Sequence, residues 1–327
     1  MRISVALATY QGARFLEQQL DSIAAQATPP DEVVVSDDGS VDGTVALVDA
    51  FAARAPFAVV RHVNDERLGP ARNFEVAIRR CRGDVIALAD QDDVWLPQKL
   101  ARLRAAFAAP AAIGLAFSDC ELIDERSRPL GTTGWTAIGL RAKERDAIGH
   151  GDAFRVLVSR QHRAGGTVTG ATMAFRADVV DLALPLPDAV AATGKGLLHD
   201  GWIALAAAAV APVALVPESL VRHRQHPGQE IGMTGARRAT GSSEGGRDAS
   251  PAWMRELRSR LVTRAPTEPR AAASVAVLDG WLRHFDARDA LPDARVRRIP
   301  GIGRELVTGR YHAYSSGVRS AVRDLAR

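Results

Sequence analysis

Short apolar runs alternate with helix-patterned segments through the first 120 residues, and this rhythm constrains the fold more than any other feature. Strands are expected at residues 3–8, 32–36, 58–63, 85–89 and 113–118. Helices are expected between them, at residues 13–26, 42–54, 70–81 and 97–107. Apolar residues at helical spacing, and aspartate or proline at helix starts, support these segments. Such a rhythm predicts an α/β fold with a mostly parallel, doubly wound sheet.

The rest of the chain is less regular. Glycines throughout residues 121–165 favour a loop-rich insertion, followed by a short strand at 170–175, a helix at 200–210 and a strand at 213–216. Amphipathic patterns return near 253–262 and 272–285. We therefore predict three parts: an α/β domain at 1–234, a flexible linker or lid at 235–251, and a helical, basic C-terminal extension at 252–327.

Composition narrows the class of protein. Hydrophobic residues make up 46% of the 327 residues and charged residues 24%, which is typical of a globular protein in water. The two cysteines are too few for a disulfide framework and favour a reducing compartment. The longest apolar stretch, 203–216, falls short of the roughly 20 residues that a membrane span needs. We expect a cytoplasmic protein.

Charge is unevenly distributed along the chain. Residues 236–327 hold 18 Lys and Arg against 10 Asp and Glu, a net charge of +8. The remaining residues, 1–235, hold 24 Lys and Arg against 28 Asp and Glu, a net charge of −4. The basic part is either a solvated, arginine-rich tail or a surface that binds an acidic partner or anionic lipid at the inner face of the cytoplasmic membrane. No nucleic-acid partner is expected.

Three carboxylates within four residues follow the fourth expected strand. Asp90, Asp92 and Asp93, with Gln91 among them, end the apolar run 84–89. Carboxylates this close repel one another unless a positive group lies among them, and hard oxygen ligands suit Mg²⁺ or Mn²⁺. Strand residues two apart point the same way, so Asp90 and Asp92 are expected to face one ion. A surface turn with solvated acids, or a helix cap at Asp93, is the alternative.

A second acidic pair follows the second expected strand. Asp37 and Asp38 precede Gly39-Ser40. A carboxylate here can accept hydrogen bonds from a pyrimidine N3–H or from ribose hydroxyls, and ligands of such sheets bind at the carboxyl ends of strands. Asp, Gly and Ser also favour turns, so a strand-to-helix turn without a ligand is the alternative.

In combination these segments resemble the family 2 glycosyltransferases, and within them the rhamnosyltransferase-like bacterial enzymes. The resemblance rests on residues 8–10, 33–44, Asn73 and 89–100, the last containing Asp-Gln-Asp-Asp-Val-Trp. It is strong over 1–120 and fair over 165–235. It implies a GT-A nucleotide-diphospho-sugar transferase fold, with a donor half at 1–120 and an acceptor half at 121–234.

The resemblance also implies a donor site. Asp92 would bind a divalent metal, Mn²⁺ or Mg²⁺, that holds the donor diphosphate, with Asp90 and His226 as further ligands. The implied nucleotide and donor contacts are Thr9, Tyr10, Asp37, Asp38, Arg72, Asn73, Asp90, Gln91 and Arg224. Among them Asp38 would contact the base and Arg224 would neutralise phosphate charge. For Arg72 an exposed arginine at a helix start is the alternative.

On the acceptor side, His199-Asp200-Gly201-Trp202 is similar to the subgroup's His-Asp-Trp-Trp pattern. Asp200 would be the general base that takes the proton of the acceptor hydroxyl. A helix N-cap is the alternative role for Asp200. His199, Trp202 and Gly170 are expected near the acceptor. Gly201 replaces a tryptophan, which leaves the shape of the acceptor pocket open.

The implied function is a metal-dependent inverting glycosyltransferase. It would move a sugar such as rhamnose from a dTDP- or UDP-sugar to a glycan or lipid-linked acceptor in cell-surface polysaccharide synthesis. A sugar-phosphate nucleotidyltransferase would need a glycine-rich phosphate-binding segment after the first strand, where Thr9-Tyr10-Gln11-Gly12 stands instead. A carbohydrate-binding protein without catalytic activity on the same fold is the other alternative.

Overall fold

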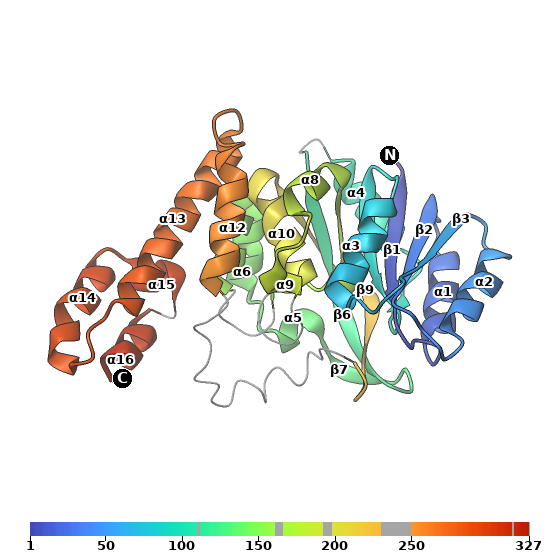
Figure 1. The fold of residues 1–327 in the computed structure, drawn as a ribbon, viewed down its shortest axis with the longest axis horizontal. Coiled ribbons are helices and arrows are strands. Elements are labelled where there is room, and N and C mark those ends of the chain that lie inside the picture. The colour runs from blue at the N-terminus through green and yellow to red at the C-terminus, as the bar shows by residue number, and fades with distance from the viewer. Residues whose placement is uncertain (110–111, 161–165, 192–197, 230–249, 316, 327) are drawn as a thin grey trace.

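Nine strands form one mixed sheet in the computed structural model, which describes residues 1–109, 112–160, 166–191, 198–229, 250–315 and 317–326 (Figure 1). The strands are β1 (Ile3–Thr9), β2 (Glu32–Asp37), β3 (Ala58–Val63), β4 (Val85–Asp90), β5 (Val94–Trp95), β6 (Leu115–Asp124), β7 (Pro129–Thr133), β8 (Met173–Arg176) and β9 (Val213–Gln225). Their order is β3-β2-β1-β4-β8-β6-β9-β5, and β7 pairs with β6.

The parallel part of the sheet is the part that the strand-helix rhythm predicts. β1 runs parallel to β2 and β4, and β2 runs parallel to β3. Beyond β4 the sheet is mixed, because β8 is antiparallel to both β4 and β6. The direction of β8 is set by the chain path that leads into it and not by its own four residues. Sequence pattern alone therefore overestimated the parallel content.

Helices cover both faces of the sheet. The helices between the first strands are α1 (Leu16–Ala24), α2 (Thr44–Ala52), α3 (Pro70–Arg80) and α4 (Lys99–Phe107), close to the predicted segments. Alternate residues of β2 enter opposite cores: Val33 and Val35 pack with α1, α2 and α4, whereas Val34 packs with α3. α10 (His199–Val210) shares the core of α3, and eleven of its twelve residues are buried.

The expected loop-rich insertion at 121–165 contains several helices and a strand in its described part, residues 121–160. They contain β7, α5 (Gly134–Ala137), α6 (Ala142–Ala147) and α7 (Ala153–Arg160). Gly139 and Gly151 adopt positive φ between these helices, so the glycines mark helix boundaries and not one long loop. β9 is also much longer than the expected strand at 213–216, since it continues to Gln225 along β6. Two short helices, α8 (Val180–Ala183) and α9 (Asp188–Ala191), precede α10.

The C-terminal extension is helical, as predicted. It contains α12 (Ser250–Val262), α13 (Pro269–Asp289), α14 (Arg295–Val307), α15 (Arg310–Tyr314) and α16 (Val318–Ala326). Of the predicted linker or lid, residues 235–249 lie outside the described residues and 250–251 belong to α12. α12 and α13 share the core of α10, whereas α14 to α16 build a small cluster of their own. No described helix is long and apolar enough to cross a membrane.

Buried polar contacts hold α14 to α16 onto α13. His284 lies 2.7 Å from a carboxylate oxygen of Glu305 and 2.8 Å from the hydroxyl of Ser315. This Ser-His-Glu arrangement resembles a hydrolase triad, but all three residues are buried and Arg288 also contacts the hydroxyl. Arg288 makes two hydrogen bonds to Asp324, whose carboxylate also accepts one from Tyr311. The arrangement is a structural tie between helices.

Asp324→Ala is expected to lower the free energy of unfolding by about 3 kcal/mol, because it leaves Arg288 and Tyr311 without their buried partner. Denaturant unfolding followed by circular dichroism measures the change. Asp293→Ala, at an exposed acid in the same extension, is the matched control and should stay near wild type. Equal stability of the two variants would contradict the structural role of the network.

Candidate active site

The carboxyl ends of β1, β2 and β4 lie side by side and place the predicted polar residues at one edge of the sheet. Thr9 pairs with Asp37 in the ladder, and Ala8 pairs with Asp90. Asp37 is fully buried, and its carboxylate accepts hydrogen bonds from the hydroxyl of Thr9 and from the backbone and hydroxyl of Ser40, each at 2.7 Å. Asp37 therefore shapes the turn after β2.

Asp38 orders the segment between β3 and α3. Its carboxylate accepts hydrogen bonds from the backbone N–H groups of Leu68 and Gly69, both at 2.8 Å, and from the amide of Asn64 at 3.0 Å. Asn73 accepts from the same Asn64 amide and donates to the carbonyl of Thr9 at 3.1 Å. The structure thus brings these predicted nucleotide residues into one network. Their contact with a nucleotide stays a prediction.

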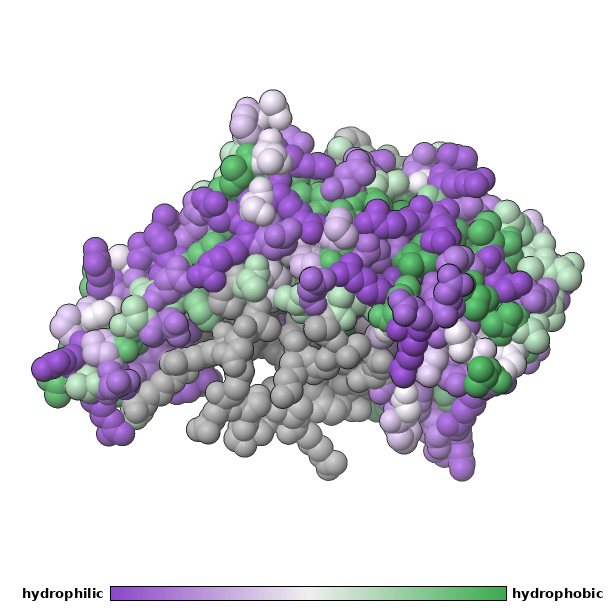
Figure 2. All heavy atoms as spheres, in the orientation of Figure 1, coloured by the Kyte–Doolittle hydropathy of each residue, from purple (hydrophilic) through white to green (hydrophobic). Residues whose placement is uncertain are grey.

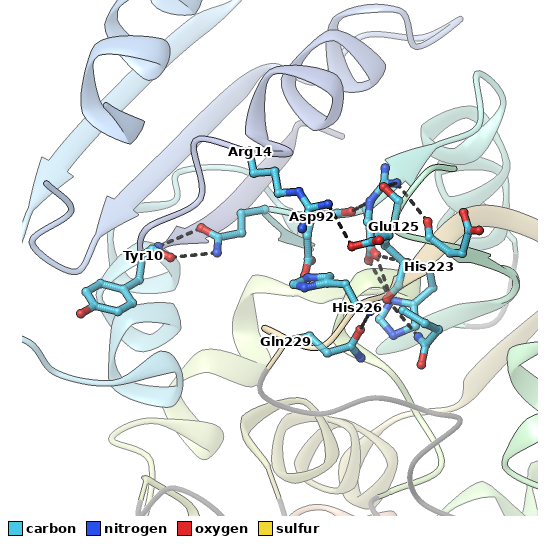
Figure 3. Close-up of polar contacts among 12 residues, drawn as sticks. Tyr10, Arg14, Asp92, Glu125, His223, His226 and Gln229 are labelled. Atoms are coloured by element: carbon cyan, nitrogen blue, oxygen red, sulfur yellow. Dashed lines mark hydrogen bonds and ion pairs between the residues drawn. The ribbon is translucent and has the colours of Figure 1, made fainter. Parts of the chain in front are cut away.

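Gln91 clamps the end of β4 to the segment after β1. Its side-chain amide pairs with both the N–H and the C=O of Tyr10, each at 2.9 Å, as the two dashed lines at Tyr10 in Figure 3 show. The guanidinium of Arg67 lies over the ring of Tyr10, 4.1 Å from its centre. A Cβ atom at Gly12 would lie only 2.2 Å from the Gln91 oxygen, so a larger residue here would displace the Gln91 amide from Tyr10. The side-chain amide of Gln91, which was predicted to contact the donor, is hydrogen-bonded to the backbone of Tyr10.

Gly12→Ala is expected to displace Gln91 and to cost about 1–3 kcal/mol of stability, with weaker nucleotide binding because Tyr10 loses its clamp. Thermal unfolding with and without nucleotide measures both effects. Gly149→Ala is the matched control, because nothing lies within 4 Å of its added Cβ atom. A Gly12→Ala protein that binds and unfolds like wild type would show that the clamp is dispensable.

Asp92 and His226 meet as the resemblance implied. The Nε2 atom of His226 lies 2.8 Å from a carboxylate oxygen of Asp92 (Figure 3). The pairing of β5 with β9, Val94 with Arg222 and Trp95 with Val221, brings these distant segments together. Asp92 comes from the turn after β4, and His226 follows the last residue of β9.

The acids at the end of β4 are close enough to repel one another. Burial raises the pKa of Asp90 well above its ordinary value, and the charges of Asp93 and Asp92 raise it further. Burial and the charge of Asp93 also raise the pKa of Asp92. A divalent cation would relieve this repulsion, and carboxylate and imidazole are suitable ligands for it. The described residues contain no cluster of three or more such ligands, so phosphate oxygens and water would have to complete the coordination.

Asp93 is not the cap of the next helix. α4 begins at Lys99 with Gln98 before it, and Asp93 is fully buried. Its carboxylate lies 2.9 Å from Nδ1 of His223 and accepts the backbone N–H of Arg224 at 2.9 Å. Burial would lower the pKa of His223, but the Asp93 carboxylate raises it to about 9. Asp93 and His223 therefore form a buried ion pair that fixes the acidic turn to β9, across 130 residues of sequence.

Arg224 does not face the diphosphate site, which corrects the sequence prediction. It is buried and stacks on Phe15, and its guanidinium is engaged on several sides by protein oxygens. One of these bonds runs to the backbone carbonyl of Asp92 at 2.7 Å, and another to the side chain of Gln18 at 2.6 Å. Arg224 positions the backbone of Asp92 and supplies no open cation for a phosphate.

Asp200 lies in the first turn of α10, where Leu198 and not Asp200 is the N-cap. Its carboxylate accepts the backbone N–H of Gly170 at 2.9 Å and that of Gly201 at 2.6 Å. The 170–172 turn that holds Asp200 packs against β4, which ends at Asp90, and the charge of Asp200 adds slightly to the raised pKa of Asp90. An added Cβ atom at Gly170 would lie 3.5 Å from the Cβ atom of Asp200, in ordinary van der Waals contact, so Gly170 and Asp200 are close neighbours.

His199 and Trp202 support α10 from inside the protein. The ring of His199 stacks on Phe74 at 4.3 Å, and burial lowers its pKa, which favours the neutral imidazole. Trp202 is fully buried and donates to the carbonyl of Ala183 at 2.8 Å. A fully buried side chain cannot touch an acceptor, so the prediction that places Trp202 on the acceptor side is wrong. Its indole anchors α10 against Arg260 of α12.

Arg72 is partly exposed and paired with acids. It contacts Glu75 at 2.7 Å and the exposed Asp188 of α9 at 2.8 Å. These contacts connect α3 to the segment before α10. A phosphate contact by Arg72 remains a prediction.

Sequence reasoning missed Lys99, a fully buried cation beneath the acidic turn. Its ammonium donates to the carbonyl of Ala171 at 2.5 Å and lies over the ring of Trp95. Burial holds its pKa well below the ordinary value, although Asp93 and Asp90 oppose this shift. Lys99 thus holds the turn whose Gly170 binds Asp200. One feature of the sequence could have predicted this burial: Lys99 lies four and eight residues before Leu103 and Phe107, so the three share the buried face of α4.

Comparison with known proteins adds a family and a fold. Residues 4–161 match the family described as Glycosyl transferase family 2. An uncharacterized glycosyltransferase of Nostoc sp. is 31% identical over 35% of this chain and 35% of that protein. The abequosyltransferase of Salmonella typhimurium is 30% identical over 39% of this chain and 40% of that protein. The matches thus span well under half of the length of these curated relatives.

Solved structures show the fold. The crystal structure of S. aureus TarS 1–349 in complex with UDP-GlcNAc matches with a TM-score of 0.54 at 16% identity, over 94% of this chain and 81% of that one. This likeness confirms the predicted GT-A fold, including helices in the C-terminal part.

Proposed function

Residues 4–161 belong to glycosyl transferase family 2, and on that premise we propose that this protein is a metal-dependent inverting glycosyltransferase. It transfers a sugar from a nucleoside diphosphate to a hydroxyl of an acceptor. The observation that carries the proposal is one shared region: Asp92 lies beside His226, and Asp200 is held by Gly170 of the 170–172 turn, which packs against β4. The site thus combines an anchor for a donor diphosphate with a candidate base.

Asp200 is the base of the proposed reaction. Its carboxylate takes the proton of the acceptor hydroxyl as that oxygen attacks the anomeric carbon, and the bond from this carbon to the diphosphate oxygen breaks. A single displacement inverts the configuration at the anomeric carbon and needs one base. The N–H groups of Gly170 and Gly201 hold the carboxylate in a fixed orientation.

The acidic turn holds the leaving group. Asp92 and His226, with Asp90 near them, would bind Mn²⁺ or Mg²⁺, which supplies Lewis-acid stabilisation to the departing diphosphate. The chain's own contribution is to hold these ligands still: Arg224 fixes the backbone of Asp92, and the Asp93–His223 pair fixes the turn to β9.

The nucleotide end of the donor lies along β1 and β2. Thr9, Asp38 and Asn73 are joined there through Asn64 by hydrogen bonds, and Tyr10 follows Thr9 in the chain. Asp38 favours a pyrimidine base in a dTDP- or UDP-sugar. The proposed sugar is a hexose such as rhamnose, and the proposed acceptor is a glycan or a lipid-linked sugar of a cell-surface polysaccharide. A lipid-linked acceptor would bring the reaction to the inner face of the cytoplasmic membrane.

A thermal-shift experiment with UDP, dTDP and GDP, each with and without Mn²⁺, tests the proposal. At a free nucleotide concentration 100 times its Kd, binding stabilises the fold by about 2.7 kcal/mol, which is visible as a higher Tm. We expect at least one nucleotide to raise the Tm only when Mn²⁺ is present. No metal-dependent shift with any of them would contradict the proposed donor site and favour a carbohydrate-binding protein without transferase activity.

A further inference from the structure

The outer faces of α14 and α16 expose an unusual share of apolar side chains. Eleven large hydrophobic residues are exposed in the described part of the chain, and six of them lie in these two short helices. The six are Val296, Ile299, Val307, Val318, Val322 and Leu325. Their exposed fractions run from 38% for Leu325 to 90% for Val307. Single exposed hydrophobic residues are ordinary, but a concentration of this kind marks an interaction surface.

Helical spacing gathers these residues on one side of each helix. On α14 the positions 296, 299 and 307 lie on one face, opposite the buried Ile302 and Glu305. On α16 the positions 318, 322 and 325 lie on one face, beside the face that buries Ser320, Ala321 and Asp324. The two helices pack against each other through these buried sides. Both are therefore amphipathic helices whose outer apolar face has no partner among the described residues.

Arginines accompany both apolar faces. Arg295, Arg297, Arg304 and Arg319 are exposed and form no ion pair within the described residues. Among described residues 291–326, Asp293 is the sole exposed acid, since Glu305 and Asp324 are buried in internal contacts. The surface therefore combines apolar side chains with an excess of unpaired positive charge.

We propose that the outer face of α14 and α16 binds an anionic lipid bilayer. Valine, isoleucine and leucine would enter the boundary between headgroups and acyl chains, and the arginines would bind lipid phosphates. A second copy of the chain fits less well, because a symmetric contact would bring the same arginines together. The surface lies at the end of the molecule farthest from β3 (Figure 1), where green and purple atoms adjoin in Figure 2.

The test is cosedimentation of the full chain with vesicles of phosphatidylcholine, alone or mixed with anionic phosphatidylglycerol. The apolar variant carries Val296→Ser, Ile299→Ser, Val318→Ser and Val322→Ser. The basic variant carries Arg295→Gln, Arg297→Gln, Arg304→Gln and Arg319→Gln. The control variant carries Val41→Ser and Val60→Ser, at exposed positions of the donor half. Circular dichroism checks that each variant folds. We expect all of them to fold, because every replaced side chain is exposed.

We expect wild type and the control variant to bind anionic vesicles only, and less at high salt. The basic variant should bind more weakly by about fivefold for each arginine removed, and the apolar variant by tenfold or more. Wild type that does not sediment with anionic vesicles, or variants that bind as wild type does, would overturn the proposal. So would a wild-type dimer in size-exclusion chromatography that the apolar variant converts to a monomer, since the face would then join two copies.

Discussion

Asp200→Asn is expected to lower kcat by about 10²–10⁴-fold, because the variant can no longer take the proton of the attacking hydroxyl. Asparagine has nearly the same shape, and its side-chain oxygen can still accept the N–H of Gly170 or Gly201. The packing of Gly170 against this side chain should therefore survive. The loss belongs to the chemical step and not to folding or to donor binding.

Three measurements separate these effects. Steady-state kinetics with the donor that the thermal-shift screen identifies should show a lower kcat with a similar donor KM. Nucleotide binding in the presence of Mn²⁺, and the Tm without ligand, should stay near wild type. Asp181→Asn, at an exposed acid of α8, is the matched control with unchanged kcat. An Asp200→Asn enzyme with wild-type kcat would rule out the proposed base.

Asp92→Asn is expected to abolish the effect of Mn²⁺ on nucleotide binding and to lower kcat by about 10²–10³-fold. Asparagine lacks the negative charge that binds a cation, and the leaving diphosphate then loses its electrostatic stabilisation. The amide can still contact His226, and Arg224 binds the backbone of residue 92, so the turn should keep its place. Unlike Asp200→Asn, this variant should lose donor affinity as well as rate.

Thermal shift with nucleotide, with and without Mn²⁺, distinguishes the two variants directly. Asp200→Asn should keep the metal-dependent rise in Tm, and Asp92→Asn should lose it. Asp146→Asn, at an exposed acid of α6, controls for the loss of one negative charge. A metal-dependent shift that persists in Asp92→Asn would exclude Asp92 as a ligand, while leaving the role of Asp200 open.

Most elements of the donor half could be predicted because their signals are local. Periodicity of apolar residues placed the first four strands and their helices within a few residues of the observed bounds. Between residues 121 and 165 the signal failed, because helices of four to eight residues are too short to show a period. The glycines at the boundaries of these helices therefore predicted loops.

The residues of the candidate site also fall into two groups: those that local sequence could select, and those whose role depends on burial. Asp90, Asp92 and Asp200 could be selected as candidates from their sequence context, and their roles stay predictions. Asp90 and Asp92 lie at the end of β4, and the 170–172 turn that holds Asp200 packs against that strand. The roles of Arg224 and Trp202 could not be inferred, because both depend on burial. An arginine within such a motif is predicted to bind phosphate. Only the structure shows that the guanidinium of Arg224 already donates to a backbone carbonyl and a neighbouring side chain. The roles of Asp93 and Lys99 could not be inferred for the same reason.

By itself the sequence determined the strand-helix rhythm, the edge where the strand ends meet and the acids gathered there, since each depends on residues close in the chain. The tertiary structure decided which of these side chains remain open to a ligand. Pairing of β5 with β9 joins Asp93 to His223 and Asp92 to His226, across 130 and 134 residues. Such contacts depend on the path of the whole chain, and no local pattern encodes that path.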